Sequence, residues 1–375
     1  MRQVNFLNRC TRLLLCLIMT VTQVCGITWF YYNPSKGRFR ISTTLKLYSY
    51  FIILCKSSFW FLILVLSLKD FFHGQTTQNM IFIPIVFLPW WNMIVLDCGG
   101  MVRQMNKILA VQYKLSALAR NPNVFRLRDL MFLIFAIQNV IRSLCLQGSG
   151  IRFLKEEKVF MFMILGISLT YQLQVTINIC LYVVLIAFYN QLHRCTKRIS
   201  NDVVTLRNSQ VLEIGQILTL VEQLKKSTEG VIQLRLKLIG ITTKLMKIFE
   251  FHWLCLLIYG FLHFAAFVDV HQNKYYTLAI CTLYLTYNFT VLKVLTFESR
   301  TSRSFSHFHL TNYHHGFDAT IEDLQLLDVW KPIRISFYGI DLDMKLLLKL
   351  LSLAGFALFF TIQSFAHRLL KNTLI

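Results

Sequence analysis

The sequence predicts an all-α, polytopic membrane protein, and three observations support this fold class. Hydrophobic residues make up 55% of the 375 residues, whereas charged residues make up only 15%. A soluble domain typically carries about 25% charged residues, so this chain has too little polar surface to cover its apolar excess in water. Apolar runs recur along the chain at about the length that crosses a bilayer. Lys and Arg gather between these runs, as they do in membrane proteins.

The net formal charge is +21, from 39 Lys and Arg against 18 Asp and Glu. In a soluble protein a charge of this size would suggest a nucleic-acid partner. Here the basic residues lie between apolar runs, where positive charge holds loops on the cytoplasmic side of a membrane. We therefore expect membrane lipid, and no nucleic acid, as a partner.

Eight apolar segments are candidate transmembrane helices. They are Leu13–Tyr32, Leu45–Leu68, Met80–Val95, Leu130–Leu146, Val159–Phe188, Phe251–Val270, Tyr276–Leu295 and Leu346–Ala366. The charges of the connecting stretches indicate how many of them cross the bilayer. Residues 34–44 carry three basic side chains and residues 98–127 carry five, and neither stretch contains an acid. Seven spans beginning at Leu45 place both stretches in the cytoplasm, with the N-terminus inside and the C-terminus outside.

The first apolar segment, Leu13–Tyr32, is not needed as a span in this topology. We expect it to lie on the membrane, or to enter it and return as a re-entrant element. Two alternatives stay open, a true span and a cleaved signal peptide. The signal peptide is an alternative because Arg12 precedes a leucine-rich run and Cys25-Gly26 supplies small residues.

Helical periodicity continues beyond the fifth apolar segment, through the basic stretch Thr196–Lys247. Apolar residues recur there near helical spacing, with Glu and Lys between them. An apolar helix face outside lipid has to pack on something, so we expect cytoplasmic helical extensions that pack within the chain or between subunits. The predicted division is 1–44, a cytoplasmic N-terminus with the re-entrant or interfacial segment; 45–188, transmembrane helices 1–4; 189–250, a cytoplasmic helical anchor; 251–296, transmembrane helices 5–6; 297–345, a cytoplasmic helical segment; and 346–375, a pore-lining last helix with an external tail.

The loops expected outside the cell are short and leave no ectodomain. A ligand from outside must therefore enter a pocket among the helices. Aromatic residues near the predicted outer helix ends are the candidates for lining it: Phe82, Phe87, Tyr171, Phe264, Phe267, Tyr276 and Tyr284. The alternative for each of them is ordinary packing or contact with lipid.

The sequence contains no recognisable catalytic or metal-binding pattern. Four histidines lie close together, at 307, 309, 314 and 315, but their spacing is irregular and no matching ligand pair occurs elsewhere. There is no Gly-rich phosphate loop, nucleophile elbow or HExxH motif. The ten cysteines lack zinc or redox spacing, and we interpret them as small apolar residues. We expect a protein that is not an enzyme and that has no metal or other cofactor.

The last apolar segment contains a polar residue near its outer end, Gln363. A glutamine in an otherwise apolar span is costly unless it faces protein or water. Repeated around a symmetric oligomer, Gln363 beside Phe360 and Phe365 would make a narrow pore with a hydrophobic gate. The alternative is a single hydrogen bond between helices or a residue at the membrane interface.

Two regions carry a family resemblance. Residues 337–343 read Phe-Tyr-Gly-Ile-Asp-Leu-Asp and precede the apolar segment that contains Gln363. Near the N-terminus, Phe-Tyr-Tyr at 30–32 is followed by Lys-Gly-Arg-Phe at 36–39 and Leu-Tyr-Ser at 47–49. In these stretches and in its whole architecture, the chain resembles the insect gustatory receptors.

The resemblance implies a ligand-gated, non-selective cation channel with four subunits around a pore lined by the last helix. It also implies a small-molecule tastant bound in the outer half of the other helices, and a cytoplasmic anchor of helix extensions. The assembly would be a homotetramer, or a heteromer with other gustatory receptors, in the plasma membrane of gustatory receptor neurons. The chain departs from the family's last-helix signature, because Phe356-Ala357 stands where Thr-Tyr is expected and Ser364 replaces the final Phe.

Two other functions remain as alternatives. A seven-helix G-protein-coupled chemoreceptor would need an external N-terminus, which the loop charges oppose, and neither a DRY-like nor an NPxxY-like run is present. A membrane transporter is disfavoured because the spans lack clusters of Asp, Glu or His. The interpretation as a ligand-gated channel predicts a receptor that detects tastants and mediates acceptance or avoidance behaviour.

Overall fold

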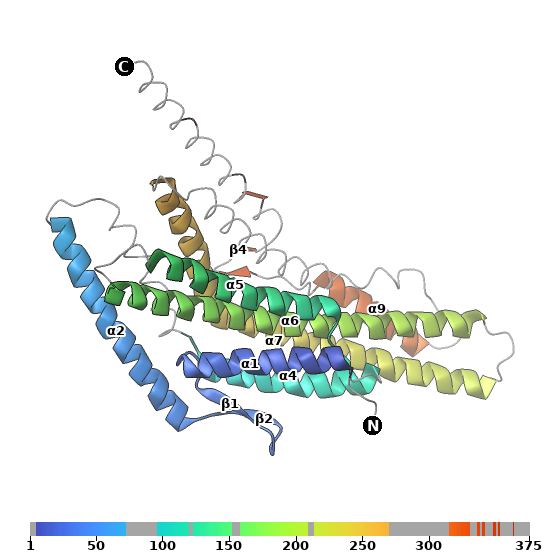
Figure 1. The fold of residues 1–375 in the computed structure, drawn as a ribbon. Coiled ribbons are helices and arrows are strands. Elements are labelled where there is room, and N and C mark those ends of the chain that lie inside the picture. The colour runs from blue at the N-terminus through green and yellow to red at the C-terminus, as the bar shows by residue number, and fades with distance from the viewer. Residues whose placement is uncertain are drawn as a thin grey trace.

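The protein is mainly a bundle of long helices, with a short β-hairpin near its N-terminal end (Figure 1). The computed structural model describes residues 5–72, 96–119, 123–151, 158–208, 214–269, 315–330, 336–337 and 340–341, and four single positions, 348, 349, 352 and 363. The helices are α1 (Phe6–Val24), α2 (Thr43–Phe72), α4 (Cys98–Ala119), α5 (Leu127–Ile151), α6 (Lys158–Asn208), α7 (Ile214–Asp269) and α9 (His315–Trp330). Within these residues four strands form two antiparallel pairs, β1 (Phe30–Asn33) with β2 (Arg38–Ile41) and β3 (Ser336–Phe337) with β4 (Ile340–Asp341).

The described residues are mostly helical, as the all-α prediction expects, and the two short strand pairs are additions to it. Strand β1 corrects the extent of the first apolar segment. Leu13–Tyr32 is not one helix, because α1 ends at Val24 and Phe30 begins β1. Gly26 lies between them with a φ of +71°, a left-handed conformation that ends a helix and that glycine adopts without steric cost. The predicted apolar segment extends past the end of the helix because β1 also contains an apolar residue, Phe30, which is completely buried.

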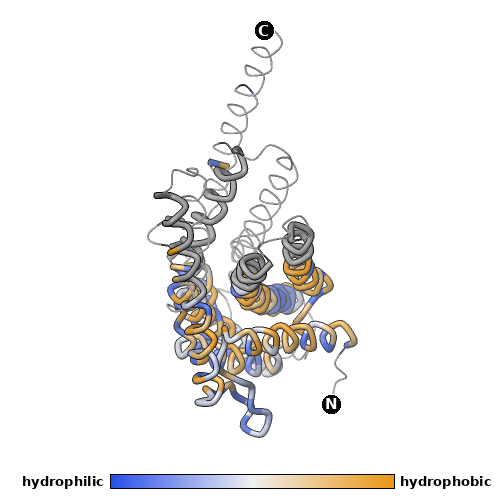
Figure 2. The backbone as a smooth tube through the Cα atoms, turned by 60° about the vertical axis from the view of Figure 1, so that its left-hand side comes forward, coloured by the Kyte–Doolittle hydropathy of each residue, from blue (hydrophilic) through white to orange (hydrophobic). Residues whose placement is uncertain are grey.

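Helix α1 buries a mainly polar side, which also includes Ile18, and exposes large apolar residues together with Arg9 and Arg12. Asn8, Thr11 and Thr22 are buried against the rest of the protein, whereas Leu13 and Leu17 are exposed. Figure 2 shows that the helix is mostly hydrophobic along its length. An exposed apolar face next to basic residues is typical of a helix that lies against lipid. The re-entrant or interfacial placement of this segment stays a prediction that the exposed face favours.

Helix α4 was not predicted, although its pattern is in the sequence. Cys98, Met101, Met105, Ile108 and Leu115 recur at intervals of three, four or seven residues and are all buried. This is the apolar stripe of an amphipathic helix. The loop charges predict residues 98–127 only as a basic cytoplasmic connection, because five basic residues and no acid are interspersed with the apolar ones. The carboxylate of Asp97 caps the new helix by accepting a hydrogen bond from the N–H of Gly100 at 2.8 Å.

Helix α6 is the centre of the bundle. From Leu173 to Leu192 every residue except Val184 is buried, and α6 contacts α1, α2, α4, α5 and α7. This stretch is mainly apolar but also buries polar residues such as Gln174 and Asn178, and a helix with so many apolar residues around its circumference packs against other helices on every side. Within the described residues, one helical stretch, Gln172–Leu206, is long and apolar enough to cross a membrane, and most of it is buried inside the molecule.

Helices α6 and α7 continue well beyond the predicted spans, as the periodicity of the basic stretch indicated. The predicted span Val159–Phe188 is only the first part of α6, which ends at Asn208, and α7 begins at Ile214. In Figure 1 the two helices run side by side past the ends of α1, α4 and α5. The cytoplasmic location of these extensions stays a prediction, because it depends on the loop charges.

The other predicted spans are described in part. Helix α2 contains the predicted Leu45–Leu68, and α5 contains the predicted Leu130–Leu146. The segments Met80–Val95 and Tyr276–Leu295 lie outside the described residues. So does most of Leu346–Ala366, in which Leu346 and Leu347 are not described but 348, 349, 352 and 363 are helical.

Two asparagines attach the N-terminal region to the bundle. The side chain of Asn8 accepts hydrogen bonds from the backbone N–H groups of Val124 (3.1 Å) and Phe125 (3.0 Å), and donates one to the Phe125 carbonyl (3.3 Å). Asn106 on α4 pairs in a similar way with Phe39 on β2, accepting at 2.7 Å and donating at 3.1 Å. In each case one amide satisfies both the N–H and the C=O of one residue, as a neighbouring strand would.

Candidate functional site

The predicted ligand-pocket residues lie on different parts of the chain, and three of them have a described backbone. Tyr171 is on α6, and Phe264 and Phe267 are on α7. The connection between α6 and α7 is short and the helices pack together, so these three positions lie toward the same end of the pair. Phe82, Phe87, Tyr276 and Tyr284 lie outside the described residues. The ligand pocket stays a prediction, and α6 and α7 would both contribute residues to it.

The predicted gate residues are described at one position only. Gln363 is helical and its side chain is exposed in the single chain. Phe360 and Phe365 lie outside the described residues.

A basic residue that the sequence reasoning passed over lies beside the predicted pocket. Lys56 is in the middle of the predicted span Leu45–Leu68, and its Nζ donates a hydrogen bond to the Thr170 hydroxyl at 2.7 Å. The same Nζ lies 3.4 Å from the carbonyl oxygen of Cys25, in the turn after α1. An ionisable side chain inside a span indicates a functional site. The sequence signal for this residue was a single lysine within an apolar run. In the structure Lys56 connects α2, α6 and the N-terminal turn, at the residue that precedes Tyr171.

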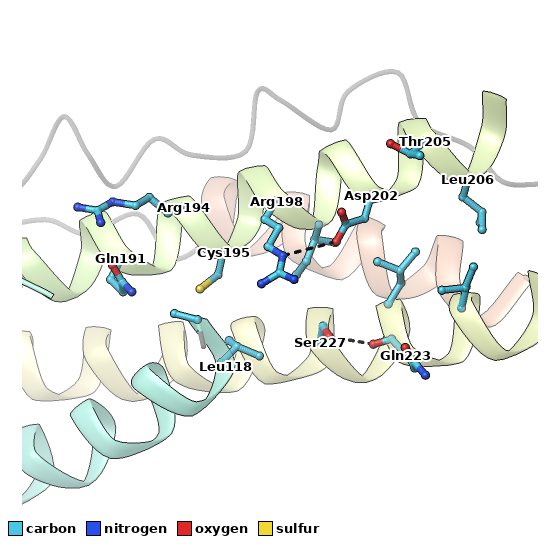
Figure 3. A pocket seen from close by; sticks show the side chains of 14 residues that line it. Leu118, Gln191, Arg194, Cys195, Arg198, Asp202, Thr205, Leu206, Gln223 and Ser227 are labelled. Atoms are coloured by element: carbon cyan, nitrogen blue, oxygen red, sulfur yellow. Dashed lines mark hydrogen bonds and ion pairs between the residues drawn. The ribbon is translucent and has the colours of Figure 1, made fainter. Parts of the chain in front are cut away.

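A second feature is a cavity of about 500 Å³ between the extensions of α6 and α7 and the end of α4 (Figure 3). Its lining residues are Leu118, Ala119, Gln191, Arg194, Cys195, Arg198, Ile199, Asp202, Thr205, Leu206, Leu220, Gln223, Leu224 and Ser227. Binding pockets for small molecules typically have volumes of about 300–1,000 Å³. The helical period places Gln191, Arg194, Cys195 and Arg198 on one face of α6, because they are three, one and three residues apart. The cavity therefore combines apolar side chains with polar groups from one face of α6 and with Gln223 and Ser227 of α7.

The polar groups of the cavity differ in their surroundings. Gln191 is only 2% exposed, and its side-chain oxygen Oε1 has no hydrogen-bond partner among the residues that the structure describes. Arg198 lies 3.9 Å from Asp202 in an ion pair that is about half exposed. Burial raises the pKa of the Cys195 thiol to about 11, although Arg198 and Arg194 favour the thiolate. The cavity is thus lined by two arginines, one aspartate, the amide of Gln191 and a thiol that is protonated at neutral pH.

Comparison with known proteins was made at the level of sequence and of fold. No family model matches the chain. A curated Drosophila melanogaster protein, gustatory receptor-like 65a, is 39% identical over 374 residues, which cover 98% of this chain and all of that protein. Among solved structures, the insect olfactory receptor OR5 from Machilis hrabei, in complex with eugenol, matches with a TM-score of 0.59 at 11% identity, covering 94% of this chain and 98% of that one.

The structural match defines the class of fold: the chain shares the fold of an insect olfactory receptor. The sequence match is more specific, because it extends over nearly the full length of both chains at 39% identity. The chain belongs to the insect gustatory receptor family. This agrees with the resemblance seen in its terminal motifs.

Proposed function

We propose that this protein is a taste receptor that acts as a ligand-gated, non-selective cation channel. The observation that carries the proposal is the identity to gustatory receptor-like 65a over nearly the whole of both chains. The likeness of fold to an olfactory receptor solved with eugenol supports a small-molecule ligand held among the helices. Four subunits would surround a pore formed by the last helix. The plasma membrane of gustatory receptor neurons is the expected location.

The exposed positions of the last helix support a pore-lining face. Ser352 and Gln363 are both helical and both exposed in the single chain. If the predicted helix is continuous, eleven residues at about 100° per residue bring them within about 20° of each other on one face. The same spacing puts Phe360 about 60° from Gln363 and Phe365 about 160° from it. We therefore propose Phe360 as the aromatic partner of Gln363 in the gate.

The channel function is tested by recording currents from cells that express the chain, alone and with other gustatory receptors of the same insect. Bitter and sweet compounds are applied after surface delivery has been verified by labelling. We expect a ligand-evoked cation current that persists when G-protein signalling is blocked. A ligand response that requires G proteins would contradict the channel and favour the G-protein-coupled alternative. Ligand-dependent uptake of the compound without current would favour a transporter.

Substitutions in the last helix test the gate. We expect Gln363→Ala and Phe360→Ala to change ion selectivity or the basal open probability, because a pore of four subunits multiplies each side-chain change by four. Phe365→Ala is the matched control on the other side of the helix and should leave permeation unchanged. The measurement is the reversal potential under bi-ionic conditions together with the current without ligand. An effect of Phe365→Ala alone would reverse the assignment of the pore face.

A further inference from the structure

The hairpin formed by β1 and β2 has two different faces. Side chains alternate between the faces of a strand, so the register places Phe30 on one face together with Tyr32 and Phe39. This face packs on the bundle, because Phe30 is completely buried and the Phe39 ring contacts it edge-on, with 6.0 Å between the ring centroids. The other face is therefore directed away from the bundle. It carries four residues that we call the basic hairpin face: Tyr31, Asn33, Arg38 and Arg40.

Positive charge collects on the basic hairpin face and in the turn beside it. Arg38 is exposed and Arg40 is half-buried, and Lys36 is exposed in the turn between the strands. No acidic residue occurs in the sequence before Asp70. In the described part of the chain, none of these three basic residues forms an ion pair. Positive charge that the protein itself does not neutralise attracts an anion from outside.

A fourth basic residue, Lys46, lies at the start of α2. Its Nζ is 5.3 Å from the centroid of the Trp29 ring and 5.6 Å from that of the Tyr50 ring. Cation–π contacts of this kind hold the ammonium group beside the two rings. Trp and Tyr are enriched where a protein crosses from the membrane into water. The predicted span begins at Leu45, so the predicted topology puts Lys46 and the base of the hairpin at the headgroups of the inner leaflet.

The first turns of α2 continue this surface with an apolar stripe. Four residues at intervals of three, one and three positions lie on one side of the helix, and each is more than half exposed: Leu47, Tyr50, Phe51 and Leu54. We call them the α2 stripe. In Figure 1 the hairpin lies at the end of α2 from which the stripe starts. A phospholipid whose acyl chains follow the α2 stripe therefore has its headgroup beside Lys46 and the basic hairpin face.

We propose that the basic hairpin face, with Lys36 and Lys46, binds an anionic phospholipid of the inner leaflet whose acyl chains lie along the α2 stripe. Basic residues next to a span are attracted to anionic lipid. A zwitterionic headgroup carries its own cation and gains less from four basic residues. The Asn106 amide pairs with the backbone of Phe39, so a lipid on the hairpin also holds α4 beside α2. The inference depends on the predicted topology and not on channel activity.

The test measures lipid binding to the purified, delipidated full-length protein in detergent, by native mass spectrometry and by the melting temperature. The probes are dioleoylphosphatidylserine, dioleoylphosphatidylcholine and soluble phosphoserine. We expect phosphatidylserine to bind about tenfold more tightly than phosphatidylcholine and to raise the melting temperature more. This extra stabilisation should shrink as salt is raised from about 0.1 M to about 1 M, because salt screens the charges. Equal effects of phosphatidylcholine, or of phosphoserine without acyl chains, overturn the proposal.

Three double variants separate this surface from a general effect of positive charge. Replacing both Arg38 and Arg40 with Gln should remove most of the preference for phosphatidylserine, whereas replacing both with Lys keeps the charge and should retain it. The matched control replaces both Lys225 and Lys237 on α7 with Gln, which removes the same charge. At about 1.5 Å per residue these lysines are about 39 and 21 Å along the helix from Phe251, where the predicted span begins. We expect the control to bind like the unaltered protein.

Each variant is compared only if its size-exclusion profile matches that of the unaltered protein. Equal losses in the glutamine variant of the hairpin and in the α7 control would mean that only net charge matters, which overturns the proposal. Lys46→Gln keeps the test decisive if the hairpin variant does not fold. It should lower the preference for phosphatidylserine by about threefold, and an unchanged preference contradicts the proposed surface. None of these measurements uses channel activity, so failure of the proposed function leaves them interpretable.

Discussion

Asn8→Leu is expected to abolish most of the folded protein. The leucine keeps nearly the same size but removes the amide that accepts hydrogen bonds from the N–H groups of Val124 and Phe125. Asn8 is 1% exposed, so water cannot replace the lost acceptor without opening the junction. A buried donor left without a partner costs about 1–3 kcal/mol, and here two are created at once. The combined loss is a large fraction of the net stability of about 5–15 kcal/mol that proteins typically have.

The expected measurement is a melting temperature lowered by many degrees, or no monodisperse protein at all, in fluorescence-detected size-exclusion chromatography. Asn123→Ala is the control at the same junction. Asn123 accepts a hydrogen bond from the backbone N–H of Asn5, but that bond is exposed to solvent. We expect its loss to change the melting temperature only slightly, because water substitutes for an exposed partner. Equal effects of the two substitutions would mean that the amide of Asn8 is not what attaches α1 to the start of α5.

The sequence predicted long helices well, because their signal is spread over many residues. In α2, α5, α6 and α7 apolar residues recur at every helical turn, so many residues support each prediction. In the basic extensions of α6 and α7 the apolar residues continue at helical spacing beyond the predicted spans. The same kind of signal existed for α4, whose buried Met101, Met105 and Ile108 are regularly spaced. The five basic residues between these apolar positions make the stretch resemble a cytoplasmic connection, and this charge signal obscures the helical period.

Single-residue contacts were not predictable from the sequence. Asn8, Asn106 and Lys56 each act through a partner more than sixty residues away. No local sequence pattern distinguishes an asparagine whose amide forms hydrogen bonds with the backbone of a distant segment from an asparagine that is exposed to solvent. For Lys56 the sequence did contain an indication, because a single charged residue lies within a predicted span. It did not indicate that the partner is Thr170. The cavity between α6 and α7 could not be foreseen either, because it depends on how α4 ends against them.

Gly26→Ala is expected to disrupt the packing of the N-terminal turn against α2. Gly26 has a φ of +71°, and an added Cβ would lie 2.9 Å from the Cβ of Ile52 and 3.0 Å from its Cγ2. A Cβ cannot move by rotating a side chain, so the backbone of the turn or of α2 has to shift. The left-handed conformation alone costs an alanine about 1–2 kcal/mol. Overpacking typically adds about 1–3 kcal/mol.

Gly37→Ala separates these two costs within the same protein. Gly37 also has a positive φ, +57°, in the turn between β1 and β2, but an added Cβ would have no atom of the described part of the chain within 4 Å. It should therefore lose only the conformational part, and its melting temperature should fall by much less than that of Gly26→Ala. The two melting temperatures, measured in one detergent, give the cost of the close approach by difference. If Gly37→Ala is as harmful as Gly26→Ala, backbone conformation explains both effects and the contact with Ile52 contributes nothing.

A larger loss in Gly26→Ala means that the turn after α1 has to stay free of side-chain atoms for α2 to pack. Because the same turn presents the Cys25 carbonyl to Lys56, such a loss would link the packing of the N-terminal segment to the polar contact beside the predicted ligand pocket.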